Sequence, residues 1–92
     1  MSDTEVRRRV VLHGFVQGVF FRETVRRRAT AAGVSGWVRN NRDGTVEAVF
    51  EGVPAEVERL VSFCREGPRG ARVDDVDVTV EDPQVLHGFE IL

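Results

Sequence analysis

The chain has 92 residues, of which 41% are hydrophobic, and a chain of this size forms one domain with a sizeable core. Its 13 basic residues stand against 15 acidic ones, and the formal net charge of -2 excludes a generally basic, nucleic-acid-binding surface. All basic residues are Arg, since the sequence contains no Lys, which excludes a Schiff-base lysine and a Walker-type phosphate loop. We expect residues 1–92 to fold as a single domain.

Cysteine content and hydropathy indicate the compartment. Cys64 is the single cysteine of the sequence, so neither an internal disulfide nor a cysteine metal cluster can form. No stretch approaches the ~18 apolar residues of a membrane-spanning helix. Residues 1–5 include two acids and lack the apolar core of a signal peptide. These features favour a reduced, soluble protein of the cytoplasm.

Charge is divided unequally along the chain. Residues 1–46 contain nine Arg and four acidic residues, which gives +5. Residues 47–92 contain four Arg and eleven acidic residues, which gives -7. Solvated faces explain this asymmetry as well as an anion-binding site in the first half does, and both explanations stay open.

Apolar periodicity alternates between that of a strand and that of a helix. Phe21, Val25 and Ala29 recur at the spacing of a helix face, and Pro54 suits the first turn of a second helix. The predicted elements, in chain order, are a strand over 7–16, a helix from Phe21 that Gly33 ends, strands over 35–41 and 45–51 joined by a turn over 41–44, a helix from Pro54 that Gly67 ends, a strand over 75–80 and a short final strand over 89–92.

This order, β-α-β-β-α-β, predicts the α+β class. The expected architecture is a ferredoxin-like sandwich, an antiparallel sheet with two helices on one face. The first and second strands then run parallel, with the third between them. Their carboxyl ends lie at the same edge of the sheet. We therefore expect the loop after the first strand and the end of the second strand to face a common site.

The loop between the first strand and the first helix carries the most chemical information. Gly14 and Gly18 permit close backbone approach, and successive N–H groups that lead into a helix form an anion nest. Arg22 lies in the first helical turn, where a cation opposes the helix dipole by ~0.3–1 kcal/mol. A bound phosphate resolves this conflict, and an ordinary turn with a surface Arg is the alternative. At the end of the second strand, the Asn40 carboxamide can orient a water molecule.

Two segments resemble the signatures of the acylphosphatase family: Gly14-Phe15-Val16-Gln17-Gly18-Val19-Phe20-Phe21-Arg22, and Gly36 to Glu47. The similarity covers nearly the whole chain, with no departure at either catalytic position. It implies hydrolysis of acyl phosphates, with Arg22 as the catalytic, phosphate-binding Arg and Asn40 as the residue that orients the attacking water. The resemblance also implies that main-chain N–H groups cradle the phosphoryl oxygens. These N–H groups belong to Gln17, Gly18, Val19, Phe20, Phe21 and Arg22.

The two segments lack other catalytic groups. They contain no Cys, Ser or His suited to nucleophilic attack, no paired carboxylates and no metal-ligand spacing. An acyl phosphate suits such a site, because its leaving carboxylate has a conjugate acid of pKa about 4 and departs unaided. We expect no cofactor and no metal, a small-molecule acyl phosphate and inorganic phosphate as ligands, no nucleic-acid or membrane partner, and a monomer.

Residues outside the two segments are expected to be structural. We expect His13 to be an ordinary strand residue and Cys64 a buried, inert thiol. We expect Trp37 and the Phe side chains to lie in the core, and Arg26 to Arg28 to form a solvated helix face. Arg7 to Arg9 are expected to protect an edge strand.

Two other functions compete with hydrolysis. RNA-recognition domains share this element order, but the third strand has Phe50 as its one aromatic residue and Glu47 and Glu51 as outward acids, unlike a base-stacking platform. A non-catalytic anion-binding or regulatory domain is the second alternative. Acylphosphatase-like domains also occur inside larger maturation enzymes that handle carbamoyl phosphate. The lack of zinc-type cysteine motifs favours a free-standing enzyme.

Overall fold

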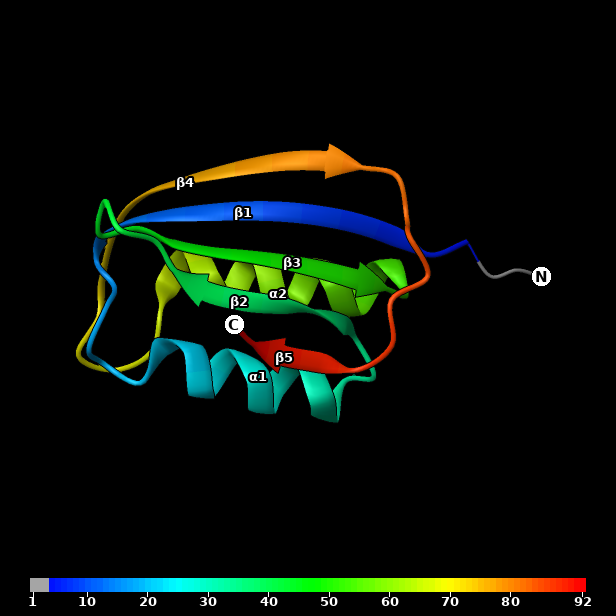
Figure 1. Ribbon diagram of the computed structural model, residues 1–92, viewed down its shortest axis with the longest axis horizontal. Coiled ribbons are helices and arrows are strands. Elements are labelled where there is room, and N and C mark those ends of the chain that lie inside the picture. Colours follow the sequence, from blue (N-terminus) through cyan, green and yellow to red (C-terminus); the bar gives the residue numbers. More distant parts are fainter. Residues whose placement is uncertain (1–3) are drawn as a thin grey trace.

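The computed structural model describes residues 4–92, and its elements follow the predicted order (Figure 1). No helix among these residues is long and apolar enough to cross a membrane. The elements are β1 (Val6–Phe15), α1 (Phe21–Ala31), β2 (Ser35–Asn40), β3 (Val46–Gly52), α2 (Pro54–Glu66), β4 (Arg72–Glu81) and β5 (Phe89–Ile91).

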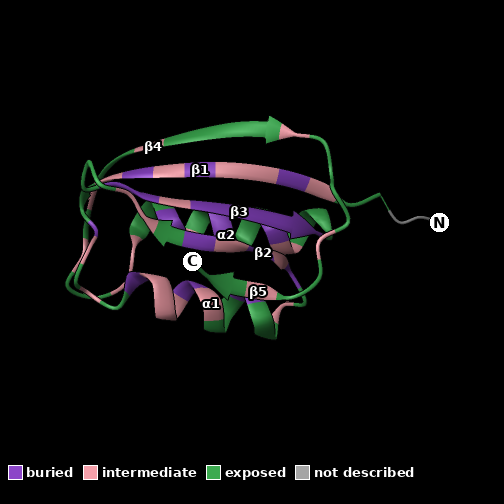
Figure 2. Cartoon of the chain, in the orientation of Figure 1, coloured by how far each residue is buried: buried purple, intermediate pink, exposed green. Residues whose placement is uncertain are grey.

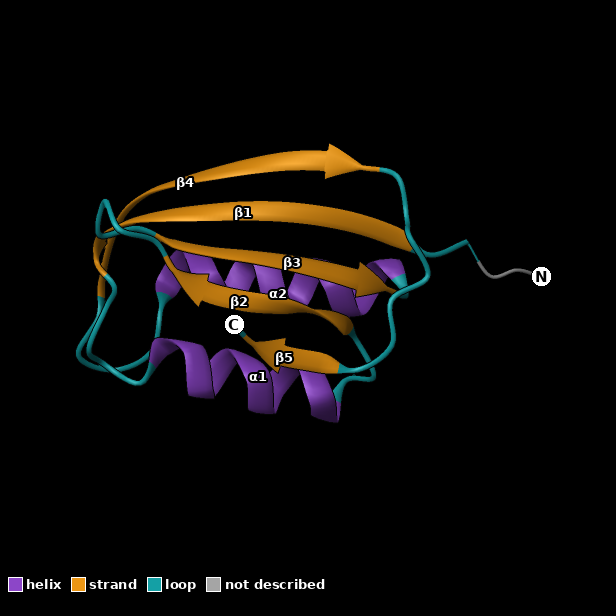
Figure 3. Ribbon diagram, viewed as in Figure 1, coloured by secondary structure: helices purple, strands orange, loops and turns teal. Residues whose placement is uncertain are grey.

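The five strands form one sheet in the order β4-β1-β3-β2-β5. β1 and β2 are both antiparallel to β3, which lies between them, so they run parallel to each other as predicted. The short β5 pairs with β2 in parallel, so the sheet is antiparallel except at this edge. Both helices cover one face, with α1 packed on β2 and β5, and α2 on β1, β3 and β4 (Figure 3).

The hydrophobic core fills the space between the sheet and the helices. Alternate residues of β1 and β3 point into it, among them Val10, Leu12, Ala48 and Phe50, and α1 contributes Phe21. Figure 2 shows this gradient, with β3 mostly buried and the edge strand β4 mostly exposed. Cys64 of α2 is fully buried, which raises the pKa of its thiol to about 12 and confirms the prediction for this residue.

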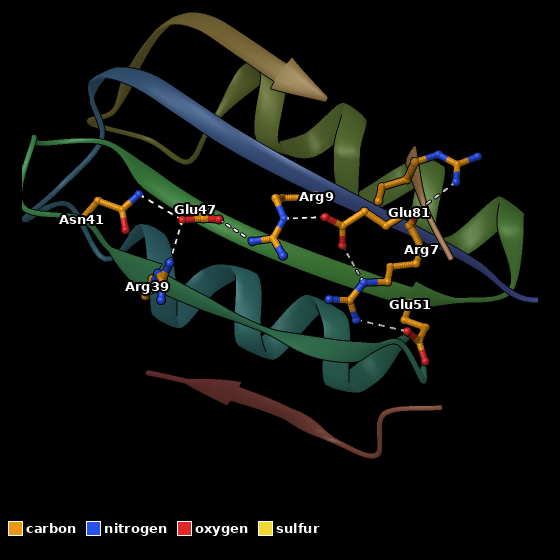
Figure 4. Close-up of polar contacts among 8 residues, drawn as sticks. Arg7, Arg9, Arg39, Asn41, Glu47, Glu51 and Glu81 are labelled. Carbon is orange, nitrogen blue, oxygen red and sulfur yellow. Dashed lines mark hydrogen bonds and ion pairs between the residues drawn. The ribbon is translucent and has the colours of Figure 1, made fainter. Parts of the chain in front are cut away.

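The face of the sheet that the helices do not cover carries a network of ion pairs (Figure 4). The guanidinium of Arg9 pairs with both Glu47 and Glu81, and that of Arg7 donates to Glu81 at 2.7 Å. β1 lies between β3 and β4, so the prediction that Arg7 to Arg9 protect an edge strand is wrong. The network also gives the charge asymmetry a third explanation, because it joins Arg residues of the first half to Glu residues of the second.

The prediction of Glu51 as an outward acid is right about the direction of its side chain but not about its exposure. Glu51 does point away from the helices, but its side chain is only 1% exposed. Its carboxylate accepts hydrogen bonds from the N–H groups of Gln84 and Leu86, at 2.9 and 2.8 Å, and from Arg7 at 3.3 Å. Burial alone would raise the pKa of Glu51, but these donors hold it below its usual value. The carboxylate therefore binds the connection between β4 and β5.

The prediction that Trp37 lies in the core is also wrong. Alternation along β2 directs Val38 into the core, so its neighbour Trp37 faces the opposite side of the sheet. There the guanidinium groups of Arg9 and Arg39 lie 5.4 and 5.0 Å from the centre of its ring, within the range of cation–π attraction. Two Phe side chains also lie outside the core, since Phe15 and Phe20 are exposed to solvent.

Candidate active site

The loop after β1 and the turn after β2 lie at the same end of the molecule, as the topology predicts (Figure 1). A cavity of about 340 Å³ opens there and brings Arg22 of α1 beside Asn40 of β2. The residues that line it are Val16, Gly18, Phe20, Phe21, Arg22, Glu23, Asn40 and Ile91.

The backbone of the loop is held in an uncommon conformation. Gly18 has φ +75°, and Phe20, the residue that caps α1, has φ 58° and ψ 24° in the left-handed region. A non-glycine residue in this conformation costs of order 1–3 kcal/mol, and such strain gathers at functional sites. Within residues 4–92, the N–H groups of residues 18–22 take part in no hydrogen bond, and α1 has no side-chain cap. The start of the helix therefore offers free donors and its positive dipole to an anion.

The guanidinium of Arg22 is available to a ligand. None of the ion pairs among the described residues includes it, and the neighbouring carboxylate of Glu23 pairs with Arg26. The hydrogen bond from Arg26 holds the pKa of Glu23 below its usual value, so this carboxylate stays ionised. Arg22 and the free N–H groups thus present positive charge from one segment.

Asn40 is the last residue of β2 and pairs with Val46 in the sheet. Its side-chain oxygen, Oδ1, is buried and has no hydrogen-bond partner within the part of the chain that the structure describes. Nearly all buried polar atoms in proteins are hydrogen-bonded, so an exception needs an explanation. This oxygen is therefore free to accept a hydrogen bond from a donor bound in the cavity.

Gln17 fixes the loop against the turn over residues 41–45. Its side-chain amide donates to the carbonyl oxygens of Asn41 at 2.8 Å and Thr45 at 3.0 Å. The turn is stabilised in addition by the Asn41 side chain, which donates to Thr45 Oγ1 and to Glu47. Gln17 and Val19 do not line the cavity, whereas the other predicted site residues do.

The sequence model of the acylphosphatase family matches residues 8–91. The chain belongs to the acylphosphatase family. An acylphosphatase of Haloarcula marismortui is 55% identical over 85 residues, which is 92% of this chain and 93% of that relative. The solved structure of an acylphosphatase from Coxiella burnetii superposes with a TM-score of 0.91 at 35% identity, and the match covers 96% of this chain and 93% of that one.

The fold also matches part of a much longer protein. Full-length HypF, solved in a phosphate- and nucleotide-bound form, superposes with a TM-score of 0.89 at 27% identity, and the match covers 97% of this chain but 12% of HypF. The matches to the two acylphosphatases, in contrast, each cover 93% of the relative. The family model and the curated relatives show that the chain is an enzyme, an acylphosphatase that hydrolyses acyl phosphates.

Sequence reasoning missed three residues of the acylphosphatase cavity, Val16, Glu23 and Ile91, although Val16 lies in the first signature segment. Ile91 reaches it because β5 pairs with β2, and a strand of three residues is too short to show a period from which this could be inferred. Glu23 follows Arg22 directly, and its position in the first helical turn was the available signal. His13, in agreement with its prediction as a strand residue, lies outside the cavity and is 3.0 Å from Asp77.

The donor set of the cavity is poor in metal ligands. Glu23 is the one carboxylate on its wall, and it is already paired with Arg26. Over residues 4–92, no group of three or more His, Cys, Asp or Glu residues could hold a metal ion. The cavity instead combines a guanidinium, backbone N–H groups and a carboxamide.

Proposed function

We propose that this acylphosphatase acts without a metal, by in-line attack of a water molecule that Asn40 orients on a phosphoryl group that Arg22 and the loop bind. The observation that carries the proposal is the buried, unpartnered Oδ1 of Asn40 on the wall of the cavity that also contains Arg22. A buried acceptor with no protein donor is suited to a water molecule whose remaining lone pair faces the substrate.

Arg22 and the N–H groups of residues 17–22 hold the phosphoryl oxygens. The guanidinium is planar and offers two parallel donors to a phosphate. The backbone donors surround the same oxygens and need no rearrangement as charge develops in the transition state. Support comes from the absence of competing hydrogen bonds to the N–H groups of residues 18–22 within the described chain.

The reaction proceeds by direct transfer to water. One O–H of the water donates to Asn40 Oδ1 while its oxygen forms a bond to phosphorus, opposite the acyl oxygen. The bond from phosphorus to the acyl oxygen breaks, and the carboxylate leaves with the electron pair. A proton of the water passes to the phosphate, so the products are a carboxylate and inorganic phosphate. Positioning and charge stabilisation suffice, because the leaving carboxylate is stable without protonation.

The donor set supports metal independence. A divalent cation such as Ca²⁺ takes about six to eight oxygen ligands, and Mg²⁺ takes about six. The cavity wall offers it one carboxylate, already paired with Arg26, and the carboxamide of Asn40. This scarcity of metal ligands favours Arg22 as the group that neutralises the phosphoryl charge.

The volume of the cavity supports a small-molecule ligand. At about 340 Å³ it lies at the low end of the ~300–1,000 Å³ of small-molecule sites. The ion pairs of Glu47 and the burial of Glu51 on β3 disfavour the RNA-binding alternative, which requires exposed aromatic residues there. We propose that the enzyme acts as a monomer in the cytoplasm, a location supported by the lack of a second cysteine to pair with Cys64.

The test is hydrolysis of acetyl phosphate in the presence of a chelator, with inorganic phosphate as a competitor. Arg22→Ala should lower kcat/KM by about 10²–10³, as removal of one oxyanion donor does. Arg22→Lys should restore this only in part, because Lys lacks the planar fork. Asn40→Ala should lower kcat with little change in KM, the pattern of a contact made only in the transition state. Arg27→Ala, an exposed Arg on the same helix, is the matched control.

Three outcomes contradict the proposal. Loss of wild-type activity in the chelator shows that a metal takes part. An unchanged kcat in Asn40→Ala, or a rise in KM alone, removes Asn40 from the reaction with water. Binding of phosphate without any turnover leaves the cavity as an anion site of a regulatory domain.

A further inference from the structure

The cavity has two chemically different parts. Gly18, Arg22 and Asn40 form the polar part, to which the proposed function assigns the phosphoryl group. Apart from Glu23, the rest of the wall is apolar, and the most exposed apolar members are Phe20 and Ile91, at 83% and 38%. Neither residue has a role in binding phosphate through its side chain.

We propose that the side chains of Phe20 and Ile91 bind the acyl group, and that this enzyme prefers acyl phosphates whose acyl group is apolar and uncharged. The inference rests on the proposed function, because the phosphoryl group must occupy the polar part for the acyl group to reach these residues.

Phe20 departs from three local preferences at once. It is a non-glycine residue in the left-handed region, and its large apolar ring is exposed to solvent. It also occupies the N-cap of α1, where Ser, Thr, Asp or Asn would hydrogen-bond the first helical N–H groups. Such departures are expected where a residue serves function instead of stability. A ligand surface explains both the position of the ring at the cavity and its exposure.

Ile91 forms a second wall from a remote part of the chain. β5 is fixed against β2 by hydrogen bonds on both sides of Ile91, from Gly36 N–H to Gly88 O and from Leu92 N–H to Val38 O, each 2.9 Å. The strand therefore holds an apolar side chain at the cavity, although Ile91 itself is not part of the core. A flat aromatic acyl group can contact a phenyl ring and an aliphatic side chain together.

Charge on the wall disfavours an acyl group with a carboxylate of its own. Arg22 and Glu23 are the ionisable residues among those that line the cavity, and the proposed function assigns Arg22 to the phosphoryl group. Glu23 is anionic and is held so by its pairing with Arg26. A second carboxylate on the substrate would approach this like charge without a free cation to bind it.

The experiment compares kcat/KM for benzoyl, acetyl and succinyl phosphate, which carry an aromatic, a small and an anionic acyl group. Phe20→Asn replaces the ring but keeps a residue that tolerates the left-handed region. Ile91→Ala shortens the second wall. The matched controls are Val85→Asn, at a left-handed, 73% exposed residue outside the cavity, and Leu92→Ala, at the exposed neighbour of Ile91.

We expect wild type to favour benzoyl phosphate over both other substrates. Each cavity variant should lower the ratio of benzoyl to acetyl kcat/KM about tenfold, the low end of the ~10–200-fold that a missing methylene group costs in an apolar pocket, because this cavity is open. The inhibition constant of inorganic phosphate should change little in Ile91→Ala, and both control variants should keep the wild-type ratio.

Equal losses for benzoyl and acetyl phosphate in both cavity variants would overturn the acyl-binding role, and so would unchanged ratios. Succinyl phosphate turned over as well as benzoyl phosphate would overturn the preference for uncharged groups. Failure of the proposed function is distinguishable from these results, because it appears with acetyl phosphate in Arg22→Ala or Asn40→Ala and does not depend on the acyl group.

Discussion

Replacement of Gln17 by Leu tests how the loop and the turn after β2 are held together. The variant removes both hydrogen bonds of the side-chain amide, to the carbonyl oxygens of Asn41 and Thr45, and keeps the backbone N–H. Each such bond contributes ~0.5–1.5 kcal/mol. Both carbonyls keep another donor, since Asn41 O accepts from Gly44 and Thr45 O accepts from Asn41. We therefore expect a loss of about 1–2 kcal/mol in the free energy of unfolding, measured by urea denaturation.

The effect of this variant on catalysis should exceed its effect on phosphate binding. The phosphoryl donors and Arg22 stay in one segment, so the inhibition constant of phosphate should change by less than about threefold. Asn40 directly precedes the turn that Gln17 holds. A shift of about 1 Å between reacting groups can cost ~10²-fold, so kcat should fall about 10- to 100-fold.

A second substitution at this position, Gln17→Glu, sharpens the test. Its carboxylate would face two carbonyl oxygens with no proton to donate, so kcat should fall at least as far as in the Leu variant. An unchanged kcat in both variants would refute the positioning role of Gln17. A loss of phosphate affinity in step with kcat would place the side chain in the phosphate site instead.

The remaining predictions concern stability and reactivity. Glu51→Gln should lower the free energy of unfolding by about 2–4 kcal/mol, because one buried N–H would then face an amide NH₂. The control is Glu66→Gln, at an exposed residue, and equal stabilities of the Glu51→Gln variant and the wild type would contradict the account. Glu47, Glu51 and Glu81 have pKa values below their usual 4.5, so the stability they give is complete above that pH and is lost as the pH falls through the lowered values. Urea denaturation between about pH 6 and about pH 3 measures this, and higher stability in acid would refute it. Cys64, with a pKa of about 12, should resist a thiol reagent at about pH 8 until the protein is unfolded, and rapid labelling of the native protein would contradict its burial.

The meeting of Arg22 and Asn40 could be predicted because it depends on local signals. Alternation around Leu12 and Val38 identifies two strands, and helical spacing from Phe21 identifies the connection between them. A right-handed crossover then brings both carboxyl ends to one edge. The cavity at that edge follows from these three features, even though the roles of its residues in the reaction still depend on the experiments above.

The features that could not be predicted depend on segments remote in sequence. Alternation along β3 predicts that Glu51 points away from the helices, and the same rule applied to β2 places Trp37 on that side, contrary to its prediction as a core residue. Alternation does not show what covers either side chain. The segment after β4 covers Glu51, and Arg side chains from two strands flank Trp37. Ile91 reaches the cavity only through the parallel pairing of β5, for which three residues give no periodic signal. Each of these features depends on the position of a chain segment that is distant in the sequence.

The strand order also determines when this protein can fold during its synthesis. β1 and β2 precede the turn over residues 41–45, whereas β3, β4 and β5 follow it. Each of the neighbouring pairs β4-β1, β1-β3, β3-β2 and β2-β5 joins a strand from before the turn to one from after it. A nascent chain that ends at the turn therefore has no two strands that pair in the finished sheet. Arg22 and Asn40 are both made early, but their shared cavity awaits the arrival of β3 and β5, and folding that depends on such non-local pairing is slow and cooperative.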